Sequence, residues 1–192
     1  TPLAAGEITS LTPALGQRGT EVKIEGTAMR SGGSTIDAAF LAGVEVETLG
    51  DQSDEVVEVV AAGSDDAVTG DVVFNLDTGA QTTLENGWEY VAAGSIDSAS
   101  PASGQAGTKV EISGSTMLAG ANDIDSVVLA GSAAEIISVS DDKLEVIVAD
   151  IEAGSGDILV TTDSGAWVRG GEWEYLSRGE IASVTPAEGV WG

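Results

Sequence analysis

One motif occurs almost three times in this chain, and its spacing limits what the chain can fold into. The best copy, residues 98–114, reads Ser-Ala-Ser-Pro-Ala-Ser-Gly-Gln-Ala-Gly-Thr-Lys-Val-Glu-Ile-Ser-Gly. A second copy spans residues 10–26, and a shortened one begins at Ser183. The copies recur at intervals of about 85 to 88 residues, which is the size of one small β-sandwich domain and longer than a solenoid repeat. The spacing therefore predicts tandem β-sandwich domains.

The repeat also predicts the domain boundaries. Residues 1–5 should be the end of a preceding unit or a linker, and residues 6–91 the first domain. The second domain should span residues 92–176, and residues 177–192 should be a linker and the start of a third unit. Since both ends fall inside the repeat pattern, we expect the sequence to be a piece of a longer protein. The third motif, if ordered, should lie against the second unit or borrow strands from a neighbouring chain, which would lead to head-to-tail fibres.

Short segments with a period of two residues predict the strands. Val22 and Ile24 alternate with charged residues, as do Val110 and Ile112 in the second unit, so each of these strands should have one buried face. Turn residues separate about seven short strands in each unit, and no segment has a helical period. The predicted core includes Val22, Ile24, Leu41, Val110, Ile112 and Leu129, with Trp88 and Trp173 largely covered. The fold class is therefore expected to be all-β.

The second unit is three residues shorter than the first. We place two of these deletions between Ala61 and Asp71 and one near Leu84, because length changes are tolerated best in loops.

The aromatic residues fall into two groups. Four recur at the end of each unit, which indicates packing in a core or a domain junction: Trp88, Tyr90, Trp173 and Tyr175. Trp167 and Trp191 have no counterparts. Trp191 stands at the position of Arg18 and Ala106 and could pad a domain junction or a partner contact. A carbohydrate-binding platform would need several exposed rings on one strand face, and only Trp167 is a candidate for one.

The charge of the chain excludes several kinds of partner. Asp and Glu number 32 against 7 Lys and Arg, which gives a net charge of −25. Such a surface repels nucleic-acid phosphates and acidic lipid headgroups. The longest apolar runs are too short to cross a bilayer, and the absence of Cys excludes disulfides. We therefore expect no nucleic-acid partner and no direct membrane insertion.

The residue types also argue against an enzyme and a resident cofactor. The chain has no His, no Cys and no glycine-rich loop followed by Lys-Ser or Lys-Thr. Calcium is the one open possibility, because Asn122, Asp123 and Asp125 place three oxygen donors in one loop. A complete Asp-x-Asp-x-Asp-Gly loop is absent, so we favour a solvated acidic surface over a calcium site.

Three features together resemble the IPT/TIG family of immunoglobulin-like domains. They are the motif above preceded by Ile96, a central Leu-Ala-Gly hairpin, and a closing aromatic-x-Tyr. The chain departs from the family pattern at Met29 and Met117, where Phe is common, and at Ala42 and Ala130, where Gly is common. The resemblance implies tandem immunoglobulin-like sandwiches. Members of the family include receptor ectodomains, bacterial surface proteins, accessory modules of enzymes and transcription-factor domains, of which the last need a basic surface.

The function expected from these observations is structural or adhesive. The chain would form a semi-rigid stalk or fibre segment of an extracellular or cell-surface repeat protein. Its partners would be neighbouring modules of the same or an identical chain, including head-to-tail fibre assembly, and a surface protein or glycan is a further possible ligand. The alternatives are an accessory carbohydrate-binding or spacer region of a large secreted enzyme, or a viral or phage surface decoration.

Overall fold

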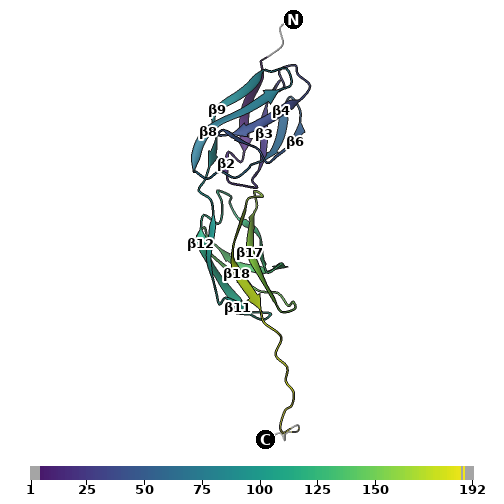
Figure 1. The fold of residues 1–192 in the computed structure, drawn as a ribbon, viewed down its shortest axis with the longest axis vertical. Coiled ribbons are helices and arrows are strands. Elements are labelled where there is room, and N and C mark those ends of the chain that lie inside the picture. The colour runs from purple at the N-terminus through teal and green to yellow at the C-terminus, as the bar shows by residue number, and fades with distance from the viewer. Residues whose placement is uncertain (1–4, 187, 189–192) are drawn as a thin grey trace.

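The computed structural model describes residues 5–186 and 188. Their regular structure consists of strands, as the sequence predicts, and the strands form two β-sandwiches placed end to end along the long axis of the molecule (Figure 1). No helix within these residues is long and apolar enough to cross a membrane. The all-β fold class is confirmed.

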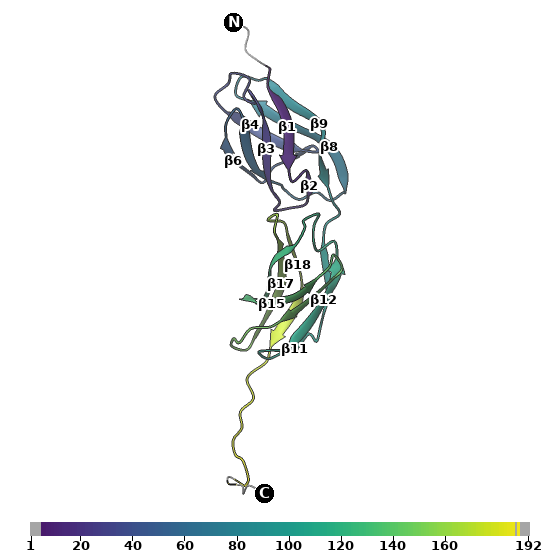
Figure 2. The same ribbon diagram turned by 180° about the vertical axis from the view of Figure 1, so that it is seen from behind.

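The first domain contains nine strands in two sheets. One sheet has the order β1-β3-β7-β6 and the other β2-β9-β8-β4-β5. Figure 2 shows the first of these sheets from the side on which β1 lies beside β3. The strands are β1 (Glu7–Thr12), β2 (Leu15–Gly16), β3 (Glu21–Thr27), β4 (Ile36–Leu41), β5 (Val44–Glu45), β6 (Thr48–Gln52), β7 (Val56–Val60), β8 (Val68–Leu76) and β9 (Gln81–Tyr90).

The second domain repeats this arrangement strand by strand. Its sheets have the orders β10-β12-β16-β15 and β11-β18-β17-β13-β14. The strands are β10 (Ser95–Ser100), β11 (Ser103–Gly104), β12 (Lys109–Ser115), β13 (Ile124–Leu129), β14 (Ser132–Ala133), β15 (Glu135–Val139), β16 (Lys143–Ile147), β17 (Gly154–Thr162) and β18 (Trp167–Tyr175). Both domains therefore have nine strands where the sequence indicated about seven. The two that were missed in each domain are β2 and β6, and β11 and β15.

The strand registers place the three deletions differently from the prediction. The Val46 amide donates to the Ala39 carbonyl, and in the second domain the Ala134 amide donates to the Val127 carbonyl, so Val46 corresponds to Ala134. Two residues further on, Thr48 pairs with Val60 in the ladder. Its counterpart, which pairs with Ile147, is Glu135, only one residue after Ala134. Glu47 therefore has no counterpart in the second domain. The other two extra residues lie in the β7–β8 loop and between Leu84 and Trp88, because the ladder pairs before and after these segments correspond. Only one deletion falls between residues 61 and 71, so the prediction of two there was wrong.

Each domain buries one apolar core between its sheets. The predicted core residues Val22, Ile24, Leu41, Val110, Ile112 and Leu129 are all buried, as are Trp88 and Trp173. These predictions are confirmed. In each domain a tryptophan meets a tyrosine edge to face, with ring centroids 5.6 Å apart for Trp88–Tyr90 and 5.9 Å apart for Trp173–Tyr175. This geometry is favoured between aromatic rings and accounts for the recurrence of the pair.

A bulge in the first strand explains the spacing of its apolar residues. Ile8 pairs with Gly26 and Ser10 with Glu25, so Thr9 is skipped in the ladder. An extra residue in one strand shifts the alternation of its side chains, and Ile8 and Leu11, three positions apart, are both buried. β10 has the same bulge at the same place.

The buried phenol of Tyr90 predicts an alkaline loss of stability in the first domain. Burial raises the pKa of Tyr90 from 10.0 to about 12. The folded domain therefore holds the phenol proton more tightly than the unfolded chain does. The free energy of unfolding of the first domain should be constant below pH 10 and should fall as the pH rises from 10 toward 12. Unfolding by denaturant at a series of pH values should show this decline, and Tyr90→Phe should weaken it. Since the Tyr90 hydroxyl has no hydrogen-bond partner within the described residues, the variant should be at least as stable as the native chain at pH 7. Tyr175→Phe changes only the second domain, so it should leave the alkaline decline of the first domain in place, and an unchanged alkaline profile in Tyr90→Phe would contradict the assignment.

Candidate functional site: the junction between the domains

The two domains meet through two short segments of backbone. The loop between β2 and β3, residues 17–20, faces the turn between β17 and β18, residues 163–166. The Glu21 amide donates to the Ser164 carbonyl over 2.8 Å, and the Trp167 amide donates to the Arg18 carbonyl over 3.4 Å. The loop of one sandwich is therefore hydrogen-bonded to the hairpin of the next.

The buried side chain of Gln17 connects three parts of the junction. Its Oε1 accepts a hydrogen bond from the Gly94 amide over 2.9 Å, and its Nε2 donates to the Trp167 carbonyl over 3.4 Å. Its own amide donates to Thr20 Oγ1 over 3.1 Å, which fixes the local loop. A buried amide side chain is stable only when its polar atoms are paired. The partners of Gln17 are Gly94 in the interdomain connection and Trp167 in the second domain. One side chain of the first domain therefore holds both of these segments at the junction.

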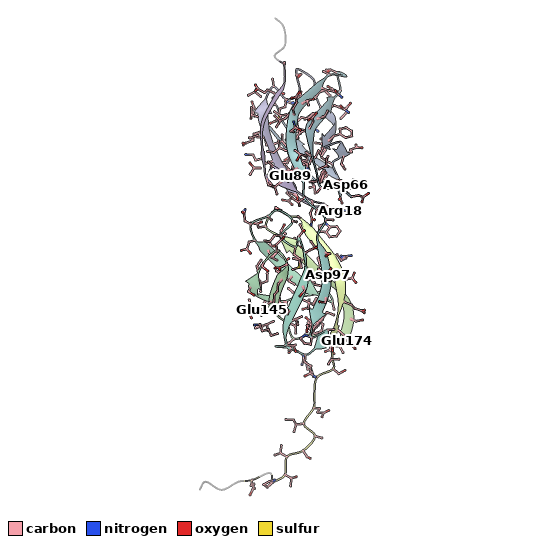
Figure 3. The ribbon with its side chains drawn as sticks, turned by 90° about the vertical axis from the view of Figure 1, so that its left-hand side faces the viewer. Arg18, Asp66, Glu89, Asp97, Glu145 and Glu174 are labelled. Carbon is pink, nitrogen blue, oxygen red and sulfur yellow. The ribbon has the colours of Figure 1, made fainter. Side chains whose placement is uncertain are left out.

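Arg18 and Trp167 close the exposed side of the junction. The guanidinium of Arg18 lies 5.3 Å from the centroid of the Trp167 ring, within the range of a cation–π contact. Arg18 Nε also lies 3.1 Å from Glu47 Oε2, an exposed ion pair that contributes little by itself. Figure 3 shows Arg18 at the boundary between the sandwiches. These contacts fix the position of the guanidinium over the ring.

Glycines permit the close approach of the two backbones. Gly19 and Gly165 both have positive φ angles, of 87° and 84°. A Cβ on Gly19 would lie 2.6 Å from Trp167 Cδ1 and 2.9 Å from the Gly165 carbonyl oxygen. A Cβ on Gly120 would collide with the side chain of Leu15. A side chain on Gly19 would push against the backbone of the second domain, whereas one on Gly120 would displace the end of the Leu15 side chain.

The position of Trp167 changes its interpretation from the sequence. Trp167 is 36% exposed, but Arg18 of the first domain lies over its ring. The backbone amide of Trp167 also donates a hydrogen bond to the first domain. It therefore lies in a domain junction. Sequence reasoning missed Arg18 and Gln17 as its partners. A signal existed, because Trp167 and Arg18 are both replaced in the other unit, by Gln81 and Ala106. Trp191 lies outside the described residues.

The calcium candidates lie in an exposed loop at the start of β13. The Asn122 amide donates to Asp163 Oδ1 over 3.3 Å, and the Ile124 amide donates to Asp123 Oδ1 over 2.8 Å. Asp125 is exposed on the strand itself. Across residues 5–186 and 188, no group of three or more His, Cys, Asp or Glu side chains is placed to hold a metal ion. The preference for a solvated acidic surface over a calcium site at these residues stays a prediction.

A shallow groove of about 410 Å³ crosses the outer face of the first domain. Strands β1, β3, β6 and β7 line it, with Glu21, Lys23 and Glu58 among the side chains. None of its lining residues is aromatic, so it lacks the ring platform that stacks against sugars. The junction is the more distinctive site.

Comparison with known proteins agrees with this fold. The family model of the IPT/TIG domain matches residues 95–175. No protein in the curated set matches the chain. Two structures of the plexin A4 extracellular region are similar to it, each with 18% sequence identity. The first, of domains 1 to 10, has a TM-score of 0.56 and covers 97% of this chain and 17% of its own.

The second plexin A4 structure, of domains 1 to 8, has a TM-score of 0.51 and covers 92% of this chain and 18% of its own. SGBP-B of the Bacteroides ovatus mixed-linkage glucan utilization locus, in complex with a mixed-linkage heptasaccharide, has a TM-score of only 0.36 at 15% identity, covering 84% of this chain and 42% of its own. The chain thus spans about a sixth of the plexin chains it matches. The second domain belongs to the IPT/TIG family of immunoglobulin-like domains, and the first domain, which repeats its motif and strand order, has the same fold.

Proposed function

We propose that this chain is a non-catalytic structural segment of an extracellular or cell-surface protein, in which tandem IPT/TIG-type sandwiches form a semi-rigid stalk or fibre. The observation that carries the proposal is the junction of Gln17, Arg18 and Trp167. A flexible tether would leave the facing loops of two domains free of specific contacts. This junction instead pairs a buried side chain and two backbone amides across the boundary.

The connection between the domains supports the same conclusion. β9 ends at Tyr90 and β10 begins at Ser95, which leaves four residues between them. The Val91 amide donates to the Gly16 carbonyl over 3.0 Å, and the Gly94 amide donates to Gln17. Both ends of the connection are therefore held by the first domain, unlike a long Gly/Ser linker that behaves as a random coil.

The end of the second domain holds the chain that follows it through the same kind of hydrogen bonds. The Leu176 amide donates to the Gly104 carbonyl over 2.8 Å, and Gln105 Nε2 donates to the Ser177 carbonyl over 2.6 Å. Gln105 is the counterpart of Gln17. The exit continues the long axis of the two sandwiches (Figure 1). A fold shared with an extracellular region of plexin A4 and a net charge of −25 support a location outside the cell and an array that stays soluble.

The distance between the two domains tests this function. The chain has no native cysteine, so spin labels can be attached at Glu85→Cys and Glu152→Cys, both exposed positions. We expect a single narrow distance distribution from pulsed electron spin resonance. Trp167→Ala and Gln17→Ala should each broaden it, because the first removes the cation–π contact and the second leaves the Gly94 amide unpaired.

Arg169→Ala is the matched control, since Arg169 is exposed on the same strand as Trp167 and should leave the distribution narrow. A broad distribution in the native chain would refute the rod and leave a tethering role. A distribution that stays narrow in both junction variants would show that other contacts hold the domains.

A further inference from the structure

Residues 180–185 have the sequence of a first strand but no strand partner. They read Glu-Ile-Ala-Ser-Val-Thr, against Glu-Ile-Thr-Ser-Leu-Thr in β1 and Ser-Ile-Asp-Ser-Ala-Ser in β10. In the structure they form no regular element, and Ile181 and Val184 are 83% and 69% exposed. The corresponding Ile8 and Leu11 in β1 are 3% and 9% exposed. Two large apolar side chains are thus left in solvent, where the first domain buries both counterparts and the second buries Ile96 and partly buries the smaller Ala99.

The spacing of these two residues indicates the kind of pairing they need. In a regular strand, positions three apart point to opposite faces. Ile8 and Leu11 reach the same core only because Thr9 is skipped in the ladder with β3, and Asp97 is skipped likewise in β10. Ile181 and Val184 have the same separation, with Ala182 at the skipped position. A proline follows all three segments, at positions 13, 101 and 186.

The connection that leads into residues 180–185 resembles the one that leads into β10. Four residues separate β9 from β10, and four residues separate Tyr175 from Glu180. The second domain holds the start of this connection through Ser177 and through an ion pair between Arg178 and Asp150 at 2.7 Å. Beyond it the chain runs away from the sandwich (Figure 1), and a Cβ on Gly179 would meet open space. Of the two arrangements expected for an ordered third motif, residues 179–186 do not adopt the one against the second unit, and strands borrowed from a neighbouring chain stay a prediction.

We infer that residues 180–185 are the bulged first strand of a third sandwich of the same kind. Its partner would be a strand with the Gly-Thr-x-Val-x-Ile-x-Gly pattern of β3 and β12, supplied by a further part of the same protein. The inference rests on the proposed function, because it names the neighbour that continues the rod. Pairing would cover Ile181 and Val184 with the core of that unit.

A second copy of this chain fits the segment less well. β3 is paired on both sides, with β1 and β7, and β12 with β10 and β16. Neither offers a free edge of the required kind. Each copy also carries a charge of −25, so two copies repel each other. A strand of the same unit would instead follow the segment after a connection as short as the eight residues between β1 and β3, so it would meet the segment at high effective concentration.

A graft into the full chain tests whether the segment is a competent first strand. Four substitutions, Ser95→Glu, Asp97→Ala, Ala99→Val and Ser100→Thr, convert β10 into the sequence of residues 180–185. We expect the second domain to keep its melting temperature within about 4 °C. A second graft keeps Ser95→Glu, Asp97→Ala and Ser100→Thr but places serine at both apolar positions, through Ile96→Ser and Ala99→Ser. This graft lacks the apolar pair and should lower the melting temperature by more than about 10 °C. If the first graft destabilises the domain as much as the second, the inference is overturned.

Sedimentation of the native chain tests the choice of partner. We expect a monomer over a range of concentrations at physiological salt. A dimer that disappears in the double variant Ile181→Ser, Val184→Ser would overturn the assignment to a further unit and identify a second copy as the partner. The graft measures the fit of a strand, whereas the distance distribution measures the junction, so each proposal can fail without the other.

Discussion

Replacing Ile112 with alanine is expected to destabilise the second domain by about 2–5 kcal/mol and to leave the first domain unchanged. Ile112 is fully buried in β12, where it pairs with Ala99 on one side and Leu144 on the other. The substitution removes three buried carbons and leaves a cavity in the core between two sheets that are held by their own ladders. The surrounding structure can relax only in part, so the loss exceeds the transfer free energy of the side chain.

Hydrogen exchange measured peptide by peptide separates the two domains. In Ile112→Ala, amides of β10–β18 should lose protection while those of β1–β9 keep theirs. Ile24→Ala is the mirror experiment, since Ile24 is the buried counterpart in β3, and it should reverse the pattern. Ile137→Ala, at a largely exposed position of β15, should change stability by less than about 0.5 kcal/mol. Equal loss of protection in both domains would show that they unfold as one unit.

Much of the fold could be predicted because its determinants are local. Val22 and Ile24 alternate with charged neighbours, which fixes the buried face of β3 without knowledge of its partners. The Leu-Ala-Gly hairpin places Ala42 and Gly43 at positive φ, and Ala130 and Gly131 likewise. A motif repeated at domain spacing then predicts that both units share one fold. Each of these inferences depends on residues close together in sequence.

The missed strands depend on distant partners. β6 is an edge strand of five residues whose register with β7 shifts between Leu49 and Gln52, so its side chains do not alternate cleanly. β2 and β11 have two residues each and exist only through parallel pairing with β9 and β18. No local pattern distinguishes such segments from loops.

The junction was hidden from the sequence for the same reason. Gln17 and Trp167 are 150 residues apart, and their contact is set by how two finished domains meet. The one available clue was the failure of Arg18 and Trp167 to recur, since a residue that serves a single junction need not be repeated in every unit.

Substitution of Gly114, the last residue of the repeated motif, is expected to destabilise the second domain by about 1–3 kcal/mol. Gly114 pairs with Ile96 next to the bulge in β10, where the skipped residue brings the two backbones together. A Cβ at this position would collide with the carbonyl oxygen of Ser95 and lie 3.2 Å from the Ile96 Cα. Both obstacles are backbone atoms, so Gly114→Ala can be accommodated only by moving β10 away from β12.

Gly154→Ala is the control for this prediction, because Gly154 begins β17 and a Cβ there meets nothing within 4 Å. Thermal unfolding should show a lower melting temperature for Gly114→Ala and no loss for Gly154→Ala. Gly26→Ala should reproduce the effect in the first domain, since its Cβ would collide with the Glu7 carbonyl oxygen. If Gly114→Ala melts with the native chain, β10 can move without cost, and the bulge does not explain why the motif ends in glycine. If it melts early, the same constraint applies wherever residues 180–185 pair, and their partner strand must also carry glycine opposite Ile181.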